Sequence, residues 1–291
     1  MTVTLRLNWP QWQGGEPAAV DSLTPELTRE EGRLAYHVGG HMASLLAPDA
    51  SGPVESVPIG LYDEDLPARD GIVAKDEMLE QTRAALALIE RHRADRIVTI
   101  GGSCSVSIAP LSYLAARYPD DVAVVWMDSH ADSNLPGGPN AGLNTMVVSH
   151  LLGHGDAEFL ALLPGRVRPS NVVLAGVHGW ADLDRTNVEN WGLALVAPSA
   201  EEHFVAELVR RFESTGCSRV AVHLDLDVID SDQVAYGMAH EPGGIDTETV
   251  IASLQALASA GDLVGITVAE FVPREAMRLR SLLRDLPLIG L

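Results

Sequence analysis

A chain of 291 residues that is 46% hydrophobic is long enough to bury one large core or two modest ones. Forty acidic residues against twenty basic ones give a formal net charge of −20, so nucleic acid is not an expected partner, because its phosphates would be repelled. The sequence has no uncharged apolar stretch of about 18 residues, the length that predicts a membrane-spanning helix.

Cysteine content and the start of the sequence bear on the compartment. Two cysteines, Cys104 and Cys217, are too few for a disulfide framework. Residues 1–15 contain no long apolar segment of the kind found in secretory signals. We therefore expect a cytoplasmic protein that does not associate with membranes.

Short β-branched runs alternate with longer helical patterns along the chain. Strands are predicted at residues 96–101, 122–128, 171–177, 219–227 and 263–270. Helices are predicted at residues 77–93, 107–118, 200–215 and 246–260, the last with Asp246 as its N-cap and Gly261 just past its end. Nearly continuous apolar strands separated by helices are typical of a parallel sheet covered on both faces. We expect one α/β domain of the doubly wound type over residues 1–291.

Polar clusters follow three of these strands, at the sheet edge where ligands bind in such folds. They read GGSCS at 101–105, DSHAD at 128–132 and DLDVID at 225–230. A fourth strand end carries Glu270, in AEFVP. Strand alternation would turn the residues of each D-x-H-x-D or D-x-D motif toward one face.

The two aspartate motifs together predict a metal centre. Four carboxylates and an imidazole would converge if the strands end near one another: Asp128, His130, Asp132, Asp225 and Asp227. Such a group is very costly unless cations neutralise it, and carboxylates with histidine suit Mn²⁺. Bridging carboxylates would let the set hold two ions about 3.5–4 Å apart. Either motif alone is more often a loop feature or a helix cap, so the pairing carries the prediction.

These motifs resemble the ureohydrolase superfamily, which includes arginases, agmatinases, guanidinobutyrases and formiminoglutamases. The family carries a glycine pair ending in His, then D-x-H-x-D, then D-x-D-x-x-D, and the resemblance runs from residue 97 to 273. It includes EPGGI at 241–245 and AEFVP at 269–273, and PQWQG at 10–14 is similar to the first-strand loop of some members. It implies an arginase-like three-layer α/β/α sandwich with a mostly parallel sheet, two Mn²⁺ ions and a homo-oligomer, trimeric or hexameric.

The resemblance also implies a reaction, the hydrolysis of a small guanidino compound to urea or a substituted urea. Its ligands would form two sets that share Asp128 and Asp225: Cys104, Asp128, Asp132 and Asp225 for one ion, and His130, Asp128, Asp225 and Asp227 for the other. Glu270 matches the glutamate that holds the substrate guanidinium, and Asn134 matches the asparagine that contacts the amino-acid end. Asp132 would accept a proton from the attacking water. Asp230 would lie behind the ligands.

One departure from the family lies in the glycine motif. The family reads G-G-D-H, whereas this chain reads Gly101-Gly102-Ser103-Cys104. A cysteine thiolate is a softer ligand than imidazole, so another divalent transition metal could replace Mn²⁺. The same substitution occurs in the branch that hydrolyses N-hydroxyarginine, which the segment CSVS resembles.

A second departure lies in the loop after Asp132. Arginases place a proton-shuttling histidine there, in G-N-L-H-G, whereas residues 142–146 read GLNTM. Candidate substitutes as proton donor are His150, His154, His178 and His240. Many relatives have an arginine–aspartate pair where this chain has His178, and Asp182 or Asp184 would be the substrate contacts from that loop.

Two alternatives stay open at this point. The same site could hydrolyse another C–N or amide bond, although the histidine-rich catalytic loop of the deacetylases, which share this general fold, is not visible. The chain could also be a degenerate metal-binding family member with a regulatory or assembly role, in which Cys104 is only a small buried thiol.

Overall fold

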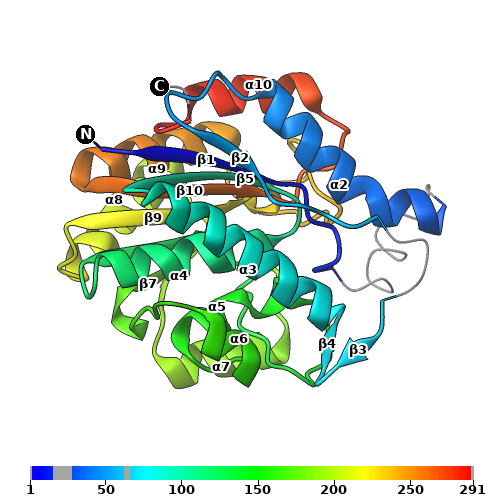
Figure 1. Cartoon of the computed structure of the whole chain (residues 1–291). Coiled ribbons are helices and arrows are strands. Elements are labelled where there is room, and N and C mark those ends of the chain that lie inside the picture. Colours follow the sequence, from blue (N-terminus) through cyan, green and yellow to red (C-terminus); the bar gives the residue numbers. More distant parts are fainter. Residues whose placement is uncertain (1, 16–27, 62–65, 290–291) are drawn as a thin grey trace.

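The computed structural model describes residues 2–15, 28–61 and 66–289, in which helices cover both faces of an eight-stranded sheet (Figure 1). The strand order is β2-β1-β5-β10-β9-β6-β7-β8, and every neighbouring pair is parallel. The strands are β1 (Thr4–Trp9), β2 (Val54–Ser56), β5 (Arg96–Gly101), β6 (Val122–Met127), β7 (Val172–Ala175), β8 (Ala194–Val196), β9 (Arg219–Asp225) and β10 (Asp262–Ala269). A separate antiparallel pair joins β3 (Ala68–Arg69) to β4 (Ile72–Val73).

Helices form a layer on each side of the sheet. One core lies under α3 (Lys75–His92), α4 (Ile108–Arg117), α5 (Val147–Leu152), α6 (Ala157–Leu162) and α7 (Asp182–Trp191). The other lies under α2 (Arg29–Leu46), α8 (Glu201–Ser214), α9 (Thr247–Ala260) and α10 (Ala276–Asp285). Short 3-10 helices are η1 (Cys104–Ser107), η2 (Leu143–Met146), η3 (Pro169–Asn171) and η4 (Leu226–Val228).

Strand β6 shows why the sequence reads as nearly continuously apolar. Val124 and Trp126 face the core under α3 and α4, whereas Val125 and Met127 face the core under α8 and α9. A parallel strand that is buried on both faces has no solvent side on which polar residues could alternate. The predicted three-layer α/β/α sandwich is therefore confirmed.

Most predicted elements are present with shifted ends. Strand β5 has the predicted bounds, and β6, β7, β9, β10, α3, α4, α8 and α9 lie within two residues of theirs or end earlier. Asp246 caps α9, since its Oδ1 accepts a hydrogen bond from Thr249 N at 2.7 Å. Strands β1 to β4 and β8, and helices α2, α5, α6, α7 and α10, were not predicted as elements.

The predicted alternation at the two aspartate motifs is wrong. Strand β6 ends at Met127, so residues 128–132 form a turn in which Asp132 has a left-handed φ of +44°. Strand β9 ends at Asp225, and Asp227 lies in η4. Turn geometry, rather than strand pleating, therefore brings these side chains together.

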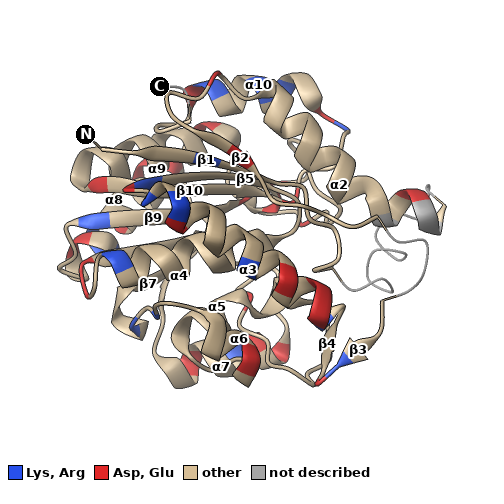
Figure 2. Ribbon diagram, in the orientation of Figure 1, with Lys and Arg blue, Asp and Glu red and all other residues tan. Residues whose placement is uncertain are grey.

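Charge and hydropathy on the outside agree with the composition. In the ribbon of Figure 2, acidic and basic residues are interspersed along the described helices and loops. Within the described ranges, no helix is long and apolar enough to cross a membrane.

Candidate metal centre

Four adjacent strands deliver the predicted site residues to one edge of the sheet. These strands lie in the order β5-β10-β9-β6. Cys104 follows β5, Glu270 follows β10, Asp225 ends β9 and Asp128 follows β6. Along the chain, β1, β2 and β5 form one side of the sheet, then β6, β7 and β8 run outward to the opposite edge, and β9 and β10 later fill the gap between β5 and β6. Such a reversal of winding is where open α/β sheets bind ligands.

The exit from β5 places Cys104 against the neighbouring strands. A side chain at Gly102 would put its Cβ 1.7 Å from the Gln11 carbonyl oxygen, so this close approach requires glycine. The backbone N–H of Cys104 donates to Glu270 Oε1 at 2.8 Å, and its thiol donates to Asp225 Oδ2 at 3.0 Å. Glu270 itself has a left-handed φ of +67°, a conformation that costs energy in a non-glycine residue and fixes its aim.

The turn after β6 is folded around Asp128. Its Oδ1 accepts from His130 N at 2.6 Å, and its Oδ2 accepts from the Trp126 indole N–H at 2.9 Å. The His130 ring then meets η4, where Nδ1 lies 3.1 Å from Asp227 Oδ2. Ser129 N donates to the other oxygen of Asp227 at 3.2 Å.

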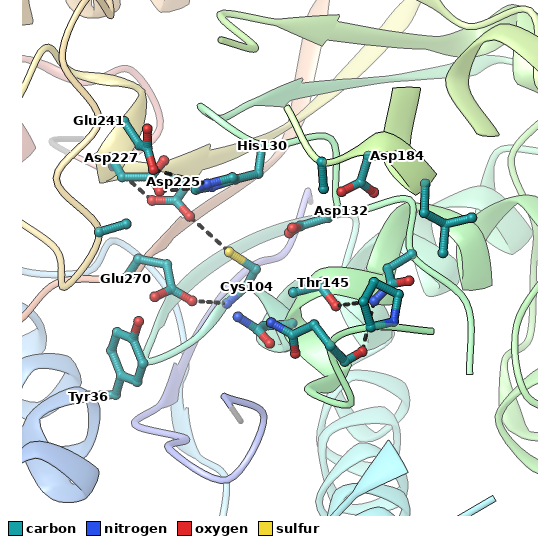
Figure 3. Close-up of a pocket in the computed structure, with 17 residues that line it drawn as sticks. Tyr36, Cys104, His130, Asp132, Thr145, Asp184, Asp225, Asp227, Glu241 and Glu270 are labelled. Carbon is teal, nitrogen blue, oxygen red and sulfur yellow. Dashed lines mark hydrogen bonds and ion pairs between the residues drawn. The ribbon is translucent and has the colours of Figure 1, made fainter. Parts of the chain in front are cut away.

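In the described part of the chain, potential metal-ligating atoms gather in two groups, each within 4.8 Å. The first is fully buried and contains Cys104, Asp128, His223 and Asp225; the second contains Asp128, His130 and Asp227. Five of the six predicted ligands therefore converge, and Asp128 belongs to both groups. Asp132 lines the same cavity but lies in neither group (Figure 3). His223 was not predicted, although it stands two residues before Asp225 on the same strand.

Burial and the charges of neighbouring acids raise the pKa of most of these carboxyl groups. Burial raises the pKa of Asp128 to about 6, with help from the charge of Asp227. It raises the pKa of Glu270 to about 7 although the Tyr36 hydroxyl and Cys104 N–H donate to that carboxylate. The pKa values of Asp132 and Asp225 lie well above the ordinary value for the same reason, reinforced by neighbouring acids.

The imidazoles of the two groups differ in charge state. Burial opposes a charge on His130, but Asp227, Asp128 and Glu241 together outweigh it, so the pKa of His130 lies well above its ordinary value. The same pairing overcomes the effect of burial on Asp227 and lowers the pKa of that carboxyl to about 2. His223 has no such partner, and burial lowers its pKa to about 3, which leaves the ring neutral.

These residues fit divalent cations. Five carboxyl groups are at most 6% exposed, and the one imidazolium cannot balance them: Asp128, Asp132, Asp225, Asp227 and Glu270. Two buried atoms, Asp132 Oδ2 and His223 Nε2, have no hydrogen-bond partner among the described residues. Oxygen, nitrogen and sulfur donors of this kind are ligands of divalent transition metals.

A cavity of about 240 Å³ opens beside both groups. It is lined by Tyr36, Cys104, His130, Asp132, Asn134, Pro139, Asn140, Asn144, Thr145, Ala181, Leu183, Asp184, Asp225, Asp227, Ala239, Glu241 and Glu270 (Figure 3). The Asn134 amide donates to Asn140 O and Thr145 Oγ1 at 2.8 and 3.3 Å, so this side chain also folds the loop that forms one wall. Tyr36 enters from α2, and no local pattern in the sequence indicated it.

None of the four candidate proton-donating histidines lines this cavity. His150 is buried with both ring nitrogens engaged, by Met146 O at 2.7 Å and Asp156 N at 2.9 Å. His154 stacks on Trp191, with ring centroids 4.5 Å apart. The Nδ1 atom of His178 lies 2.7 Å from Gly176 O, and His240 contacts Arg274. Of the two candidate aspartates, Asp184 lines the cavity and Asp182 does not.

Comparisons with known proteins agree with this architecture. A family model described as the arginase family matches residues 41–280. An arginase of Schizosaccharomyces pombe is 25% identical over 296 residues, which cover 92% of this chain and 83% of that protein. The fold is similar to that of Entamoeba histolytica arginase in complex with L-ornithine, with a TM-score of 0.77 and 15% sequence identity. The match covers 100% of this chain and 99% of that chain. The fold is also similar to that of Bacillus caldovelox arginase, with a TM-score of 0.77 and 18% sequence identity. This match covers 100% of this chain and 97% of that chain.

Proposed function

The chain belongs to the arginase family, and from this premise we propose that it hydrolyses a small guanidino compound and releases urea or a substituted urea. Membership makes it a hydrolase of the type that acts on linear amidines. One observation carries the finer proposal: two groups of metal-ligating atoms meet at a cavity whose wall presents Glu270. We treat residues 1–291 as one metallohydrolase domain.

In this proposal the motif residues would hold two divalent cations, Mn²⁺ or another transition metal. By the motif comparison, Cys104, Asp128, Asp132 and Asp225 would hold one cation, and His130, Asp128, Asp225 and Asp227 would hold the other. When bound, such cations supply Lewis-acid activation of water and of the substrate. The buried carboxyl groups converge, and the described cavity-lining residues include no Lys or Arg that could neutralise them. This charge imbalance supports the assignment.

The chain's own residues then position the substrate and move a proton. Glu270, in its ionised form, would pair with the guanidinium through two parallel hydrogen bonds. Asp132 lines the cavity and its Oδ2 has no partner among the described residues, so this carboxylate can accept a proton from the attacking water and return it to the departing nitrogen. Both amide hydrogens of Asn134 are used by the loop, and Oδ1 accepts from Leu135 N at 2.9 Å, so this side chain can offer a substrate only the second lone pair of Oδ1.

We place the chain in the branch with a cysteine ligand and expect an N-hydroxyguanidino acid, such as N-hydroxyarginine, to be a better substrate than arginine or agmatine. Two features support this choice. Cys104 stands where the family has histidine, and its thiol already contacts Asp225. Asn144, in the segment without the proton-shuttling histidine, lines the cavity.

The test is a release assay on the purified, Mn²⁺-loaded protein, with metal content measured on the same sample. Arginine, N-hydroxyarginine, agmatine and guanidino acids are offered, and urea and hydroxyurea are measured. We expect release, and we expect Glu270→Gln to lower kcat/KM by about 10²- to 10³-fold while metal content is unchanged. Glu275→Gln, outside the cavity, is the matched control and should behave as wild type.

Absence of release from every compound, in protein that has bound metal, would contradict the proposal and favour the non-catalytic alternative. Release of ammonia or an acid from another C–N bond by the same sample would favour the other alternative. Cytoplasmic location and trimeric or hexameric assembly stay predictions, the latter to be measured by light scattering of the metal-loaded protein.

A further inference from the structure

His223 is a buried imidazole that the proposed reaction does not use. It lies on β9 and is 0% exposed, and its ring stacks on Trp126 with centroids 3.6 Å apart and 16° between the planes. Ser107 Oγ lies 2.7 Å from Nδ1. The Nε2 atom has no hydrogen-bond partner in residues 2–15, 28–61 and 66–289. The surroundings therefore fix the ring in one orientation and leave one nitrogen unused.

A hydrogen bond to Asp128 does not account for this orientation. The distance from His223 Nε2 to Asp128 Oδ2 is 3.8 Å, beyond the range of an N–H···O bond. That carboxylate oxygen already accepts from the Trp126 indole at 2.9 Å. A buried polar nitrogen without a partner is uncommon, which indicates that a ligand completes it.

The atoms around Nε2 have the spacing of a four-ligand metal site. Cys104 Sγ, Asp128, Asp225 and His223 present one ligating atom each, all within 4.8 Å. Metal–ligand bonds of about 2.0–2.3 Å in a tetrahedral site separate the ligand atoms by roughly 3.3–3.8 Å. The contacts of 3.0 Å between Cys104 and Asp225, and of 3.8 Å between His223 and Asp128, lie close to that range. None of the distances among the four ligating atoms exceeds 4.8 Å, so the group is compact enough to enclose one ion.

We propose that His223 Nε2 is a direct ligand of the ion that Cys104, Asp128 and Asp225 hold, in the place that the motif comparison gives to Asp132. The imidazole that the chain lacks at position 104 would thus be supplied by His223, from β9. The Nδ1–H group donates to Ser107, as the second nitrogen of a ligating histidine usually donates to a neighbour. Asp132 is then free to serve as the proton acceptor alone.

This ligand set has a consequence for the choice of metal. One sulfur, one nitrogen and two oxygens from four buried residues make a ligand set that suits Zn²⁺ or Co²⁺ better than Mn²⁺. Binding forms the sulfur–metal bond and releases the Cys104 thiol proton to solvent. The second group, with Asp128, His130 and Asp227, faces the cavity and offers only oxygen and nitrogen. The two positions therefore differ in metal preference.

The experiment measures metal binding by the metal-free protein, with Zn²⁺ and Co²⁺ as probes. In wild type, the first Co²⁺ bound should show a thiolate charge-transfer band, and X-ray absorption of the protein with one Zn²⁺ should show one sulfur and one imidazole. We expect His223→Gln to weaken the first Zn²⁺ site by more than about 100-fold, and Ser107→Ala by about 10- to 100-fold. Asp132→Asn should bind the first Zn²⁺ as wild type does.

His150→Gln is the matched control, because it removes another fully buried, neutral imidazole that lies in neither ligand group. Its Zn²⁺ affinity should equal that of wild type, which separates ligand loss from general destabilisation. Sulfur without imidazole in the wild-type spectrum would overturn the inference, whatever the folding of the variants. Loss of affinity in Asp132→Asn but not in His223→Gln would overturn it as well.

This inference rests on the metal centre of the proposed function and not on its substrate. A protein that binds Zn²⁺ through His223 but releases no urea would contradict the proposed function alone. A protein that releases urea while its zinc spectrum lacks imidazole would contradict the inference alone.

Discussion

Two clusters of charged side chains in this protein are built differently. At the start of α3, Lys75 is 1% exposed, and its ammonium group lies 2.7 Å from Asp70, 2.7 Å from Asp156 and 2.9 Å from Glu158. Arg69 also pairs with Glu158, and this pairing lowers the pKa of that carboxyl to about 2. The chain thus supplies the cations that its carboxylates need.

The metal centre has the opposite balance. Its carboxyl groups are more deeply buried, yet His130 is the one cationic group that the described residues place among them. Burial therefore raises the pKa of Asp128 to about 6 and that of Glu270 to about 7, whereas hydrogen bonds from Arg69 and Lys75 lower the pKa of Glu158. Charge balance, and not the number of acidic residues, therefore distinguishes a structural ion cluster from a cation site.

The largest expected effect is a pH dependence of stability that exists only without metal. The pKa of Glu270 is raised from 4.5 to about 7, so its contribution to stability is complete below about pH 4.5 and is lost as the pH rises through 7. A shift of this size corresponds to about 3 kcal/mol in the free energy of unfolding. Urea unfolding of the chelated proteins at pH 5 and pH 8 measures this effect. Between these pH values, the free energy of unfolding should fall by about 3 kcal/mol more in the wild type than in Glu270→Gln.

Adding Mn²⁺ or Zn²⁺ at pH 8 should restore the wild-type stability, because a cation pairs with the ionised carboxylates. Identical pH dependence in wild type and Glu270→Gln would show that the carboxyl group has its ordinary pKa. The contrast between the two clusters would then fail at its central point.

The sheet could be predicted because its central strands have a clear sequence pattern. Strands β5, β6, β9 and β10 are apolar runs buried on both faces, and each ends at a polar motif. Helix α2 could not be predicted, since Gly39 and Gly40 interrupt its helical pattern and lower helix propensity. The reason for Gly39 is tertiary: a Cβ there would lie 1.8 Å from the Phe271 carbonyl oxygen.

The site residues also fall into those that the strand pattern predicts and those that depend on tertiary packing. Cys104, Asp128 and Asp225 could be predicted because they end or directly follow strands that neighbour one another or share a neighbour in the sheet. Tyr36 could not, because its approach to Glu270 depends on how α2 packs against the end of β10. His223 had a signal, its spacing of two residues from Asp225, but this position reads equally well as strand interior.

A smaller effect is expected at the cluster that carries its own cation. Lys75→Met would leave the Asp156 carboxylate, which is 10% exposed, without its partner. We expect a loss of about 2 kcal/mol in the free energy of unfolding, less than for a fully buried pair because Asp70 and Glu158 are about half exposed. Urea unfolding measures it, and metal should not restore it. Arg210→Met, at an exposed helix pair with Glu207, is the control and should change little.

If Lys75→Met left the free energy of unfolding unchanged, the ion cluster at α3 would carry no stability. A variant that regained its stability on addition of Zn²⁺ would mean that this cluster, too, accepts cations. Either result would remove the distinction between the two regions.

The smallest effect is expected at Asp184, whose charge is balanced only in part. Its Oδ1 accepts from Ser133 N at 3.0 Å and from Ser133 Oγ at 2.8 Å, and burial still raises the pKa of this carboxyl in the cavity. We infer that the ammonium group of an amino-acid substrate supplies the missing charge. Asp184→Asn should then raise KM about tenfold, or about 1.4 kcal/mol, with kcat little changed, because the contact is the same in ground and transition states.

Two controls make this prediction specific to the ammonium group. Asp182→Asn, two residues earlier on α7 and outside the cavity, should leave KM unchanged. A guanidino acid without the amino group should be hydrolysed equally well by wild type and Asp184→Asn, since it lacks the charge that the carboxylate would meet. An equal rise in KM for both substrates would mean that Asp184 acts by shaping the loop around Ser133, in which case its charge, like that at Glu158, is structural.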